Sequence, residues 1–206
     1  MKEIRNVIFD FGTVLLDWNP RRLFTPYFQD KEKCDWFLEN VCNGEWNAQM
    51  DKGKPVSVGT EEKVAEFPEW EKEIRMYFDR WIEMIGDETP GMYELENELK
   101  AAGYRIYGLT NWNNETFCQV RHRKVFQVLD GMVVSAEEKL IKPEPEIYQC
   151  LLDRYGLDRD ECVFIDDIQK NIDGATAAGI RGILFESPAQ VRRALVDLGV
   201  KIKEEV

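Results

Sequence analysis

The chain has 206 residues, of which 44% are hydrophobic and 32% are charged, and its formal net charge is -12 at pH 7. This balance is typical of a globular protein with one sizeable core and room for an inserted subdomain. An acidic surface repels nucleic acid and anionic membranes, so neither is expected as a partner. The same surface would repel a phosphorylated ligand, so a phosphate site would need local cations.

The cysteines and the apolar runs favour a cytoplasmic protein. Five scattered cysteines without CxxC spacing argue against a disulfide framework or a zinc site and are typical of reduced thiols. The first six residues contain no apolar signal-peptide region. No apolar run approaches the roughly 20 residues that span a bilayer. The sequence carries no signal for the oligomeric state, and we expect a monomer or a homodimer.

The first strong feature in chain order is the apolar run from Val7 to Leu16, which is typical of a buried strand. Asp10 interrupts this run, and Gly12 and Thr13 allow a sharp turn directly after it. In open parallel sheets, ligands lie just beyond the carboxyl ends of the strands. The position of Asp10 therefore predicts a reactive group rather than a packing residue.

Residues 17–88 are predicted to form an all-helical cap subdomain inserted after this strand. A turn signal at residues 17–20 opens the region, and no convincing strand follows it. Its clearest helix, over residues 69–86, repeats apolar side chains every three or four positions. Five of the six tryptophans lie in the region, which indicates a separate aromatic core. Shorter helices are expected over residues 21–28, 32–40, 43–51 and 61–67.

From residue 89 onward the pattern alternates between strands and helices. This alternation indicates an α/β fold with a parallel sheet and right-handed crossovers. We predict a Rossmann-like core formed by residues 1–16 and 89–206, with a polar tail at 201–206 that frays. Strands are expected over residues 104–109, 131–134, 162–165 and 182–185. Helices are expected over residues 92–103, 114–124, 145–155, 171–178 and 188–198.

Polar side chains stand where three of these strands end, and a lysine occupies one of the connecting loops. Because the carboxyl ends of parallel strands meet at one edge of a sheet, we expect these groups to converge. Together they supply a carboxylate nucleophile, a hydroxyl and amide pair, an ammonium group and an acidic pair. The residues are Asp10, Thr110, Asn111, Lys142, Asp166 and Asp167.

Four stretches in this order resemble the motifs of the haloacid dehalogenase-like (HAD) hydrolase superfamily. They are Phe9–Leu15, Leu109–Asn111, Lys142–Tyr148 and Phe164–Asn171, and with the helical insert they span nearly the whole chain. The resemblance implies a Rossmann-like core and a helical cap that closes over the active site. Most members of the superfamily are magnesium-dependent phosphatases, which implies Mg²⁺ as the cofactor.

The resemblance also implies a set of roles at the catalytic centre. Asp10 would attack phosphorus and form an aspartyl-phosphate that water then hydrolyses. Asp10, the Gly12 carbonyl and Asp167 would hold the metal, with Asp166 flanking them, because hard cations prefer oxygen ligands.

The remaining roles concern the substrate. Thr110 and the Asn111 backbone would bind phosphate oxygens, and Lys142 would neutralise negative charge beside the nucleophile. Trp18 and Trp112 follow catalytic loops and are candidates for lining the substrate pocket.

Gly12 departs from the family pattern. Phosphatases of the superfamily usually carry a second Asp at this position, which protonates the leaving group, and such assistance is worth about 10²–10⁴-fold. One reading is a phosphatase with an easier leaving group or a substitute acid, for which Asp17 and Glu144 are candidates. A second is a metal-independent 2-haloacid dehalogenase, and a third is a catalytically weak phosphate- or metal-binding regulatory module. We favour a Mg²⁺-dependent phosphatase of a small metabolite, with sugar phosphates as the expected class.

Overall fold

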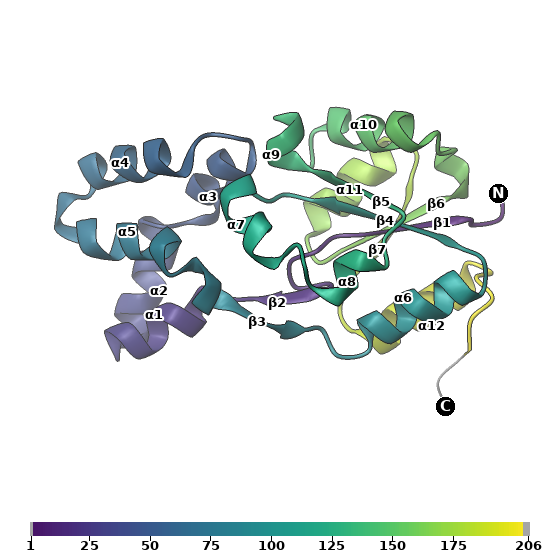
Figure 1. Ribbon diagram of the computed structural model, residues 1–206, viewed down its shortest axis with the longest axis horizontal. Coiled ribbons are helices and arrows are strands. Elements are labelled where there is room, and N and C mark those ends of the chain that lie inside the picture. Colours follow the sequence, from purple (N-terminus) through teal and green to yellow (C-terminus); the bar gives the residue numbers. More distant parts are fainter. Residues whose placement is uncertain (1, 204–206) are drawn as a thin grey trace.

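The computed structural model describes residues 2–203. Figure 1 shows a parallel sheet with helices on both faces and a group of helices to one side of it. The five strands of the sheet lie in the order β5-β4-β1-β6-β7. This arrangement confirms the predicted α/β class with a Rossmann-like sheet. The strands are β1 (Asn6–Phe9), β4 (Arg105–Thr110), β5 (Gly131–Val134), β6 (Cys162–Asp166) and β7 (Arg181–Leu184).

The central strand β1 is buried on both faces. Val7 and Phe9 belong to a cluster that includes apolar side chains of α6 (Met92–Ala101) and α12 (Pro188–Asp197). Ile8 points the other way, into a second cluster with α10 (Pro145–Tyr155) and α11 (Gln169–Ala177). Successive side chains of a strand face opposite sides, so a strand covered on both sides is apolar throughout.

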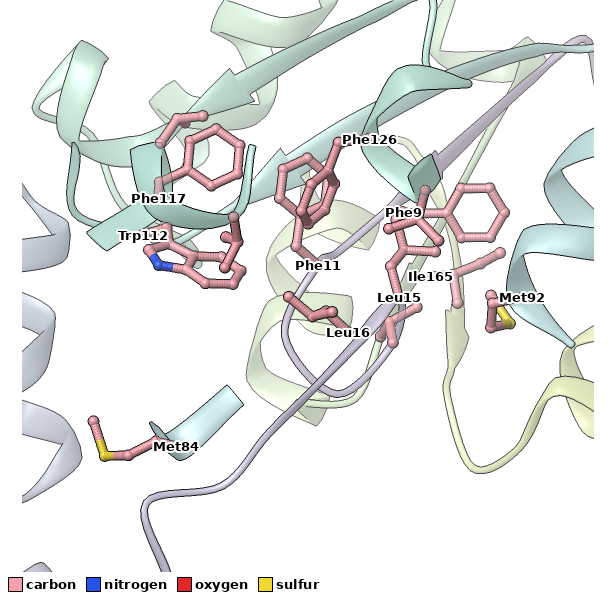
Figure 2. Packing of buried hydrophobic residues seen from close by; sticks show 14 of the residues in the cluster. Phe9, Phe11, Leu15, Leu16, Met84, Met92, Trp112, Phe117, Phe126 and Ile165 are labelled. Carbon is pink, nitrogen blue, oxygen red and sulfur yellow. The ribbon is translucent and has the colours of Figure 1, made fainter. Parts of the chain in front are cut away.

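Phe11 fixes the turn that follows β1. Its ring centroid lies 4.6 Å from that of Phe126 and 5.7 Å from that of Phe117. Figure 2 shows the three side chains in the core beside this turn. The neighbouring strand makes room for this ring at Gly108, where a Cβ atom would lie 2.3 Å from Phe11 Cε1. The Asp10 N–H donates to the Ile165 carbonyl at 2.9 Å. The backbone around Asp10 is therefore held from both neighbouring strands.

The insert consists of helices that pack around their own aromatic core. Phe24, Phe37, Trp46 and Tyr77 are buried there and contact one another or their neighbours through aromatic pairs. The first three helices match the predicted ones to within one residue, and the fourth begins five residues earlier than predicted. The helices are α1 (Arg21–Phe28), α2 (Lys31–Asn40), α3 (Gly44–Asp51), α4 (Val56–Glu66) and α5 (Glu71–Asp79).

The single helix predicted over residues 69–86 is wrong. Beyond α5 the chain forms a 3-10 turn at Trp81–Met84 and then strand β3 (Ile85–Glu88), where no strand was expected. β3 pairs antiparallel with β2 (Leu16–Trp18), which is 67 or more residues away in sequence, so no local periodicity reveals it. This ribbon carries the chain between the sheet and the insert, and the boundaries at residues 16/17 and 88/89 stay a prediction.

One predicted helix of the core is also wrong. The segment expected over residues 114–124 divides into α7 (Asn114–Val120) and α8 (Lys124–Gln127), because the backbone of Arg123 is extended. The break buries Val125 and Phe126, and Phe126 meets Phe11. A short helix that was not predicted, α9 (Ser135–Glu138), follows β5. The other predicted strands and helices of the core are present to within two residues.

The chain beyond α12 is anchored as far as it is described. The Lys201 N–H donates to the Tyr104 hydroxyl at 2.8 Å, and the Lys203 N–H donates to Glu98 Oε1 at 2.7 Å. The tail predicted to fray is thus held by hydrogen bonds at residues 201–203, and residues 204–206 lie outside the described part. Within residues 2–203, no helix combines the length and apolar character needed to cross a membrane.

Glu96 is a buried carboxyl group on α6 facing the core. Neither of its oxygens has a hydrogen-bond partner among the described residues. Burial raises the pKa of Glu96 from 4.5 to about 9, with Glu88 adding to the rise and Lys100 opposing it. Because the folded state keeps this proton while the unfolded state releases it near pH 4.5, stability declines as the pH rises from there toward 9.

Replacing this carboxyl group should therefore stabilise the fold at alkaline pH. The gain in free energy of unfolding for Glu96→Gln is expected to be larger at about pH 8.5 than at about pH 5 by on the order of 2–4 kcal/mol. Denaturant titrations at the two pH values measure it. Glu94→Gln, at an exposed position of the same helix, is the control and should be neutral at both. An equal gain at both pH values would contradict the titration of Glu96.

Candidate active site

A cavity of about 270 Å³ lies between the carboxyl ends of the central strands and the helical insert. Its walls come from both parts of the molecule, with the sheet edge on one side and α3 with Trp81 on the other. The structure brings all but one of the predicted site residues to this cavity. Those that line it are Asp10, Gly12, Trp18, Thr110, Asn111, Trp112, Lys142 and Asp167.

The ammonium group of Lys142 is buried at the centre of the site. Its Nζ lies 2.8 Å from Asp10 Oδ1 and 2.7 Å from Asp166 Oδ2, and it donates to the Leu109 carbonyl at 2.9 Å. Burial by itself lowers the pKa of Lys142, but the two carboxylates outweigh this effect and raise it above its ordinary value. Lys142 is therefore charged, and it joins the ends of β1, β4 and β6.

Asn111 holds the loop that carries this lysine. Its Oδ1 accepts from the Lys142 N–H at 2.8 Å, and its Nδ2 donates to the Lys142 carbonyl at 3.0 Å. Both ends of the Asn111 side chain are thus engaged with the Lys142 backbone. The neighbouring Thr110 is buried at the end of β4, against the same cavity.

Three carboxylates meet beside Lys142. Asp10, Asp166 and Asp167 each offer one oxygen, and these oxygens lie within 4.8 Å of one another. Burial raises the pKa of Asp10 to about 7, with Lys142 opposing the rise and Asp166 adding to it. Burial and then Asp166 also raise the pKa of Asp167, which the Thr13 side chain opposes by a hydrogen bond. One ammonium group does not balance three carboxylates, so the cluster favours a further positive charge.

Asp166 is the one member of this cluster that does not line the cavity. Both of its oxygens accept from Asn171 Nδ2, at 3.0 and 3.1 Å, and Oδ1 also accepts from the Ile168 N–H at 2.8 Å. Together with Lys142, these donors occupy the carboxylate. Asp10 and Asp167, which do line the cavity, have the more accessible oxygens.

The donor set fits a divalent cation with a preference for oxygen. Asp10 and Asp167 supply carboxylate oxygens at the cavity wall. Asn171 also lines the cavity, and its buried Oδ1 has no hydrogen-bond partner among the described residues. Ions such as Mg²⁺ bind to carboxylate, carbonyl and water oxygens, which is what this wall presents.

The two residues nominated to replace the acid missing at Gly12 do not line the cavity. Asp17 forms an exposed ion pair with Arg22, and Glu144 pairs with Lys52. That expectation is wrong, because the side chains are already engaged at the surface.

Sequence reasoning missed the contribution of the insert to the cavity. Asn47 and Asp51 line it from α3, and Asn113 lines it from the start of α7. The only signal for the first two was their spacing of four residues, which places them on one side of a helix. Such spacing is common on helices, so it identifies a site only once the cavity is known.

Comparison of the sequence with known proteins identifies a family and several related enzymes. The sequence profile of the haloacid dehalogenase-like hydrolase family matches residues 37–185. Sesquiterpene phosphatase astK of Aspergillus oryzae is 28% identical over 178 residues, which is 85% of this chain and 87% of that protein. Phosphorylated carbohydrates phosphatase of Thermotoga maritima is 24% identical over 86% of this chain and 82% of its own length. Several other curated relatives are matched over 56% or less of their length.

Solved structures share the fold of this chain. The crystal structure of a HAD family enzyme from Bacteroides thetaiotaomicron, a magnesium complex, superposes with a TM-score of 0.68. The match has 23% sequence identity and covers 90% of this chain and 95% of that one. The family profile covers most of the sequence, and the predicted motifs meet at one cavity of the expected fold. The chain belongs to the haloacid dehalogenase-like hydrolase family.

Proposed function

We propose that this hydrolase is a Mg²⁺-dependent phosphatase of small phosphorylated metabolites, with sugar phosphates as the substrate class. The observation that carries the proposal is the position of Asp10, a buried carboxylate at the cavity wall, between the ammonium group of Lys142 and the carboxylate of Asp167. A nucleophile placed between a fixed cation and an oxygen-rich cation site suits attack on a phosphate ester. The Aspergillus and Thermotoga relatives, a sesquiterpene phosphatase and a phosphorylated carbohydrates phosphatase, support the same chemistry.

Asp10, Asp167 and the Gly12 carbonyl would hold the magnesium ion. When bound, Mg²⁺ would neutralise charge on the phosphoryl oxygens. The magnesium complex of the Bacteroides enzyme supports this choice of metal. Asp166 would hold Lys142 and Asn171 in place, because its oxygens accept hydrogen bonds from both.

The proposed mechanism begins with attack of Asp10 on phosphorus, which breaks the ester bond and forms an aspartyl-phosphate. Water then attacks phosphorus, breaks the bond to Asp10 and releases inorganic phosphate. Lys142 stays protonated and balances negative charge beside Asp10 throughout. The Thr110 hydroxyl and the Asn111 backbone N–H would donate to the phosphoryl oxygens. Most of the catalysis would come from positioning and charge neutralisation.

The walls of the cavity support a sugar phosphate as the substrate. Trp81 and Trp112 meet at a centroid distance of 5.7 Å, and both line the cavity with Trp18. Such aromatic faces suit the apolar face of a sugar ring, while the amides of Asn47 and Asn113 suit its hydroxyl groups. A cavity of about 270 Å³ lies just below the range of roughly 300–1,000 Å³ typical of drug-sized ligands, which favours a small metabolite.

The glycine at position 12 favours a second candidate, a metal-independent 2-haloacid dehalogenase. Halide leaves without a proton, so such an enzyme needs no acid at this position. Asp167 would then have no cation to bind, which is why we prefer the phosphatase. The third alternative, a regulatory module, would bind phosphate or metal without turnover.

Asp10→Asn should abolish phosphatase activity. An amide is a poor nucleophile, so hydrolysis of p-nitrophenyl phosphate is expected to fall by at least about 10⁴-fold. Absorbance at saturating Mg²⁺ measures the rate. Asp17→Asn is the control. It makes the same change at a nearby aspartate that forms an exposed ion pair with Arg22, and it should keep full activity. Turnover that survives in Asp10→Asn would refute the nucleophile assignment.

Removal of divalent metal should also stop turnover. We expect a screen of phosphorylated metabolites to give the highest rates with sugar phosphates, no phosphate release in excess chelator, and recovery when Mg²⁺ is added back. Phosphate release is the readout. Chloride release from 2-chloropropionate in the presence of chelator would instead support the dehalogenase, and binding of phosphate without any turnover would support the regulatory module.

A further inference from the structure

The proposed phosphatase lacks an obvious source for the proton that its leaving group needs. Gly12 lines the cavity where family phosphatases carry a carboxyl group, and a Cβ atom built on it meets nothing within 4 Å. The space for an acid is therefore open at Gly12, and no neighbouring side chain fills it. General acid–base assistance is worth about 10²–10⁴-fold for a poor leaving group, so another group is expected to supply it.

Only a few ionisable side chains of the described residues reach the cavity. Asp10, Asp167 and Lys142 have roles in the cluster already, and Lys170 is a cation of α11. The one carboxyl group left is Asp51, which enters from the insert, opposite the sheet edge. Among the described residues, Asp51 is therefore the single candidate acid at the cavity wall.

Asp51 is the last residue of α3 and is held firmly between the insert and the core. Its Oδ2 accepts from Asn47 Nδ2 at 2.8 Å, and its backbone carbonyl accepts from the Ser135 hydroxyl of α9. The next residue, Lys52, pairs with Glu144 of the core. In Figure 1, α3 lies at the side of the insert that faces α7 and α9. These contacts fix a carboxyl group that is only 7% exposed.

The surroundings of Asp51 suit proton transfer near neutral pH. Burial raises the pKa of Asp51 to about 7, while hydrogen bonds from Asn113 and the charge of Lys142 oppose the rise. No described cation forms an ion pair with it, and the amide of Asn47 donates a hydrogen bond to it instead. A group whose pKa lies near the working pH both gives and takes a proton efficiently.

We propose that Asp51 is the general acid and base of this enzyme, a catalytic residue supplied by the insert in place of the carboxyl group missing at Gly12. The proposal rests on the phosphatase function. In the first step, the Asp51 carboxyl group gives its proton to the ester oxygen as the bond from that oxygen to phosphorus breaks and the bond from Asp10 to phosphorus forms. The alcohol leaves, and Asp51 is ionised.

The second step restores both side chains. The Asp51 carboxylate takes a proton from a water molecule while the water oxygen forms a bond to phosphorus. The bond between phosphorus and Asp10 breaks, inorganic phosphate leaves, and Asp51 is protonated again. Because Asp51 belongs to α3, the acid is in place only where the insert rests on the core through Ser135 and Glu144.

Two aryl esters of similar shape, p-nitrophenyl phosphate and phenyl phosphate, distinguish a role of Asp51 in proton transfer from a purely structural role. In Asp51→Asn, release of p-nitrophenol is expected to keep a burst of one equivalent whose rate falls by less than about 10-fold, because this leaving group needs little protonation. The burst with phenyl phosphate, whose leaving group has a pKa of about 10 like tyrosine, should slow by about 10²-fold or more. Steady-state turnover should be slow with both esters, since water has lost its base. Stopped-flow measurements at saturating Mg²⁺ give both phases.

A second acid provides a rescue test. The double variant Asp51→Asn with Gly12→Asp should recover at least about 10-fold of the lost rate on phenyl phosphate, because position 12 has open space for a carboxyl group. Glu45→Gln is the matched control, since it removes a carboxyl group at an exposed position of the same helix and leaves Asp51 and its contacts unchanged. Its rates on both esters should stay close to those of the unaltered enzyme.

The outcomes distinguish a failure of the Asp51 role from a failure of the phosphatase assignment. If the unaltered enzyme turns over both esters and Asp51→Asn slows both bursts equally, or neither, the role of Asp51 is overturned and the phosphatase assignment stands. A retained p-nitrophenol burst also shows that the variant is folded. If the unaltered enzyme releases no phosphate from either ester, the phosphatase assignment fails and this proposal fails with it.

Discussion

The buried ammonium group of Lys142 is the interaction on which the site depends. It contacts Asp10, Asp166 and the Leu109 carbonyl, and it thereby joins the ends of three adjacent strands. A charge removed from water costs several kcal/mol unless close partners compensate for it, and the two carboxylates do so here. The parallel order β4-β1-β6 is what brings those partners to one edge.

The same arrangement leaves an excess of negative charge, which a bound cation would balance. Asp10, Asp166 and Asp167 crowd their oxygens into a small volume, and a single ammonium group faces them. Burial and mutual repulsion raise the pKa of Asp10, which would weaken it as a nucleophile. A bound divalent cation would favour the ionised form, because opposite charge stabilises a carboxylate. In the proposed function, the bound cation would therefore both balance the charge of the carboxylates and keep Asp10 ionised as the nucleophile.

The insert completes a cavity that the sheet alone would leave open. The sheet edge supplies Asp10, the proposed nucleophile, and the charged groups around it, while Trp81, Asn47 and Asp51 come from the other side. In the proposed function, the strand ends would carry the chemistry and the insert would select the substrate. If Asp51 acts as proposed, the insert supplies part of the chemistry as well, which relieves the requirement for a carboxyl group at Gly12.

The sequence by itself determined the alternation of the core and the convergence of Asp10, Thr110, Lys142 and Asp167, since these depend on local periodicity and on strand ends meeting at one edge. Only the tertiary structure decided the pairing of β2 with β3, because its partners are far apart in the chain and no local pattern links them. It also decided that Asp51 faces the site, since burial and neighbours, rather than residue type, give an aspartate its role.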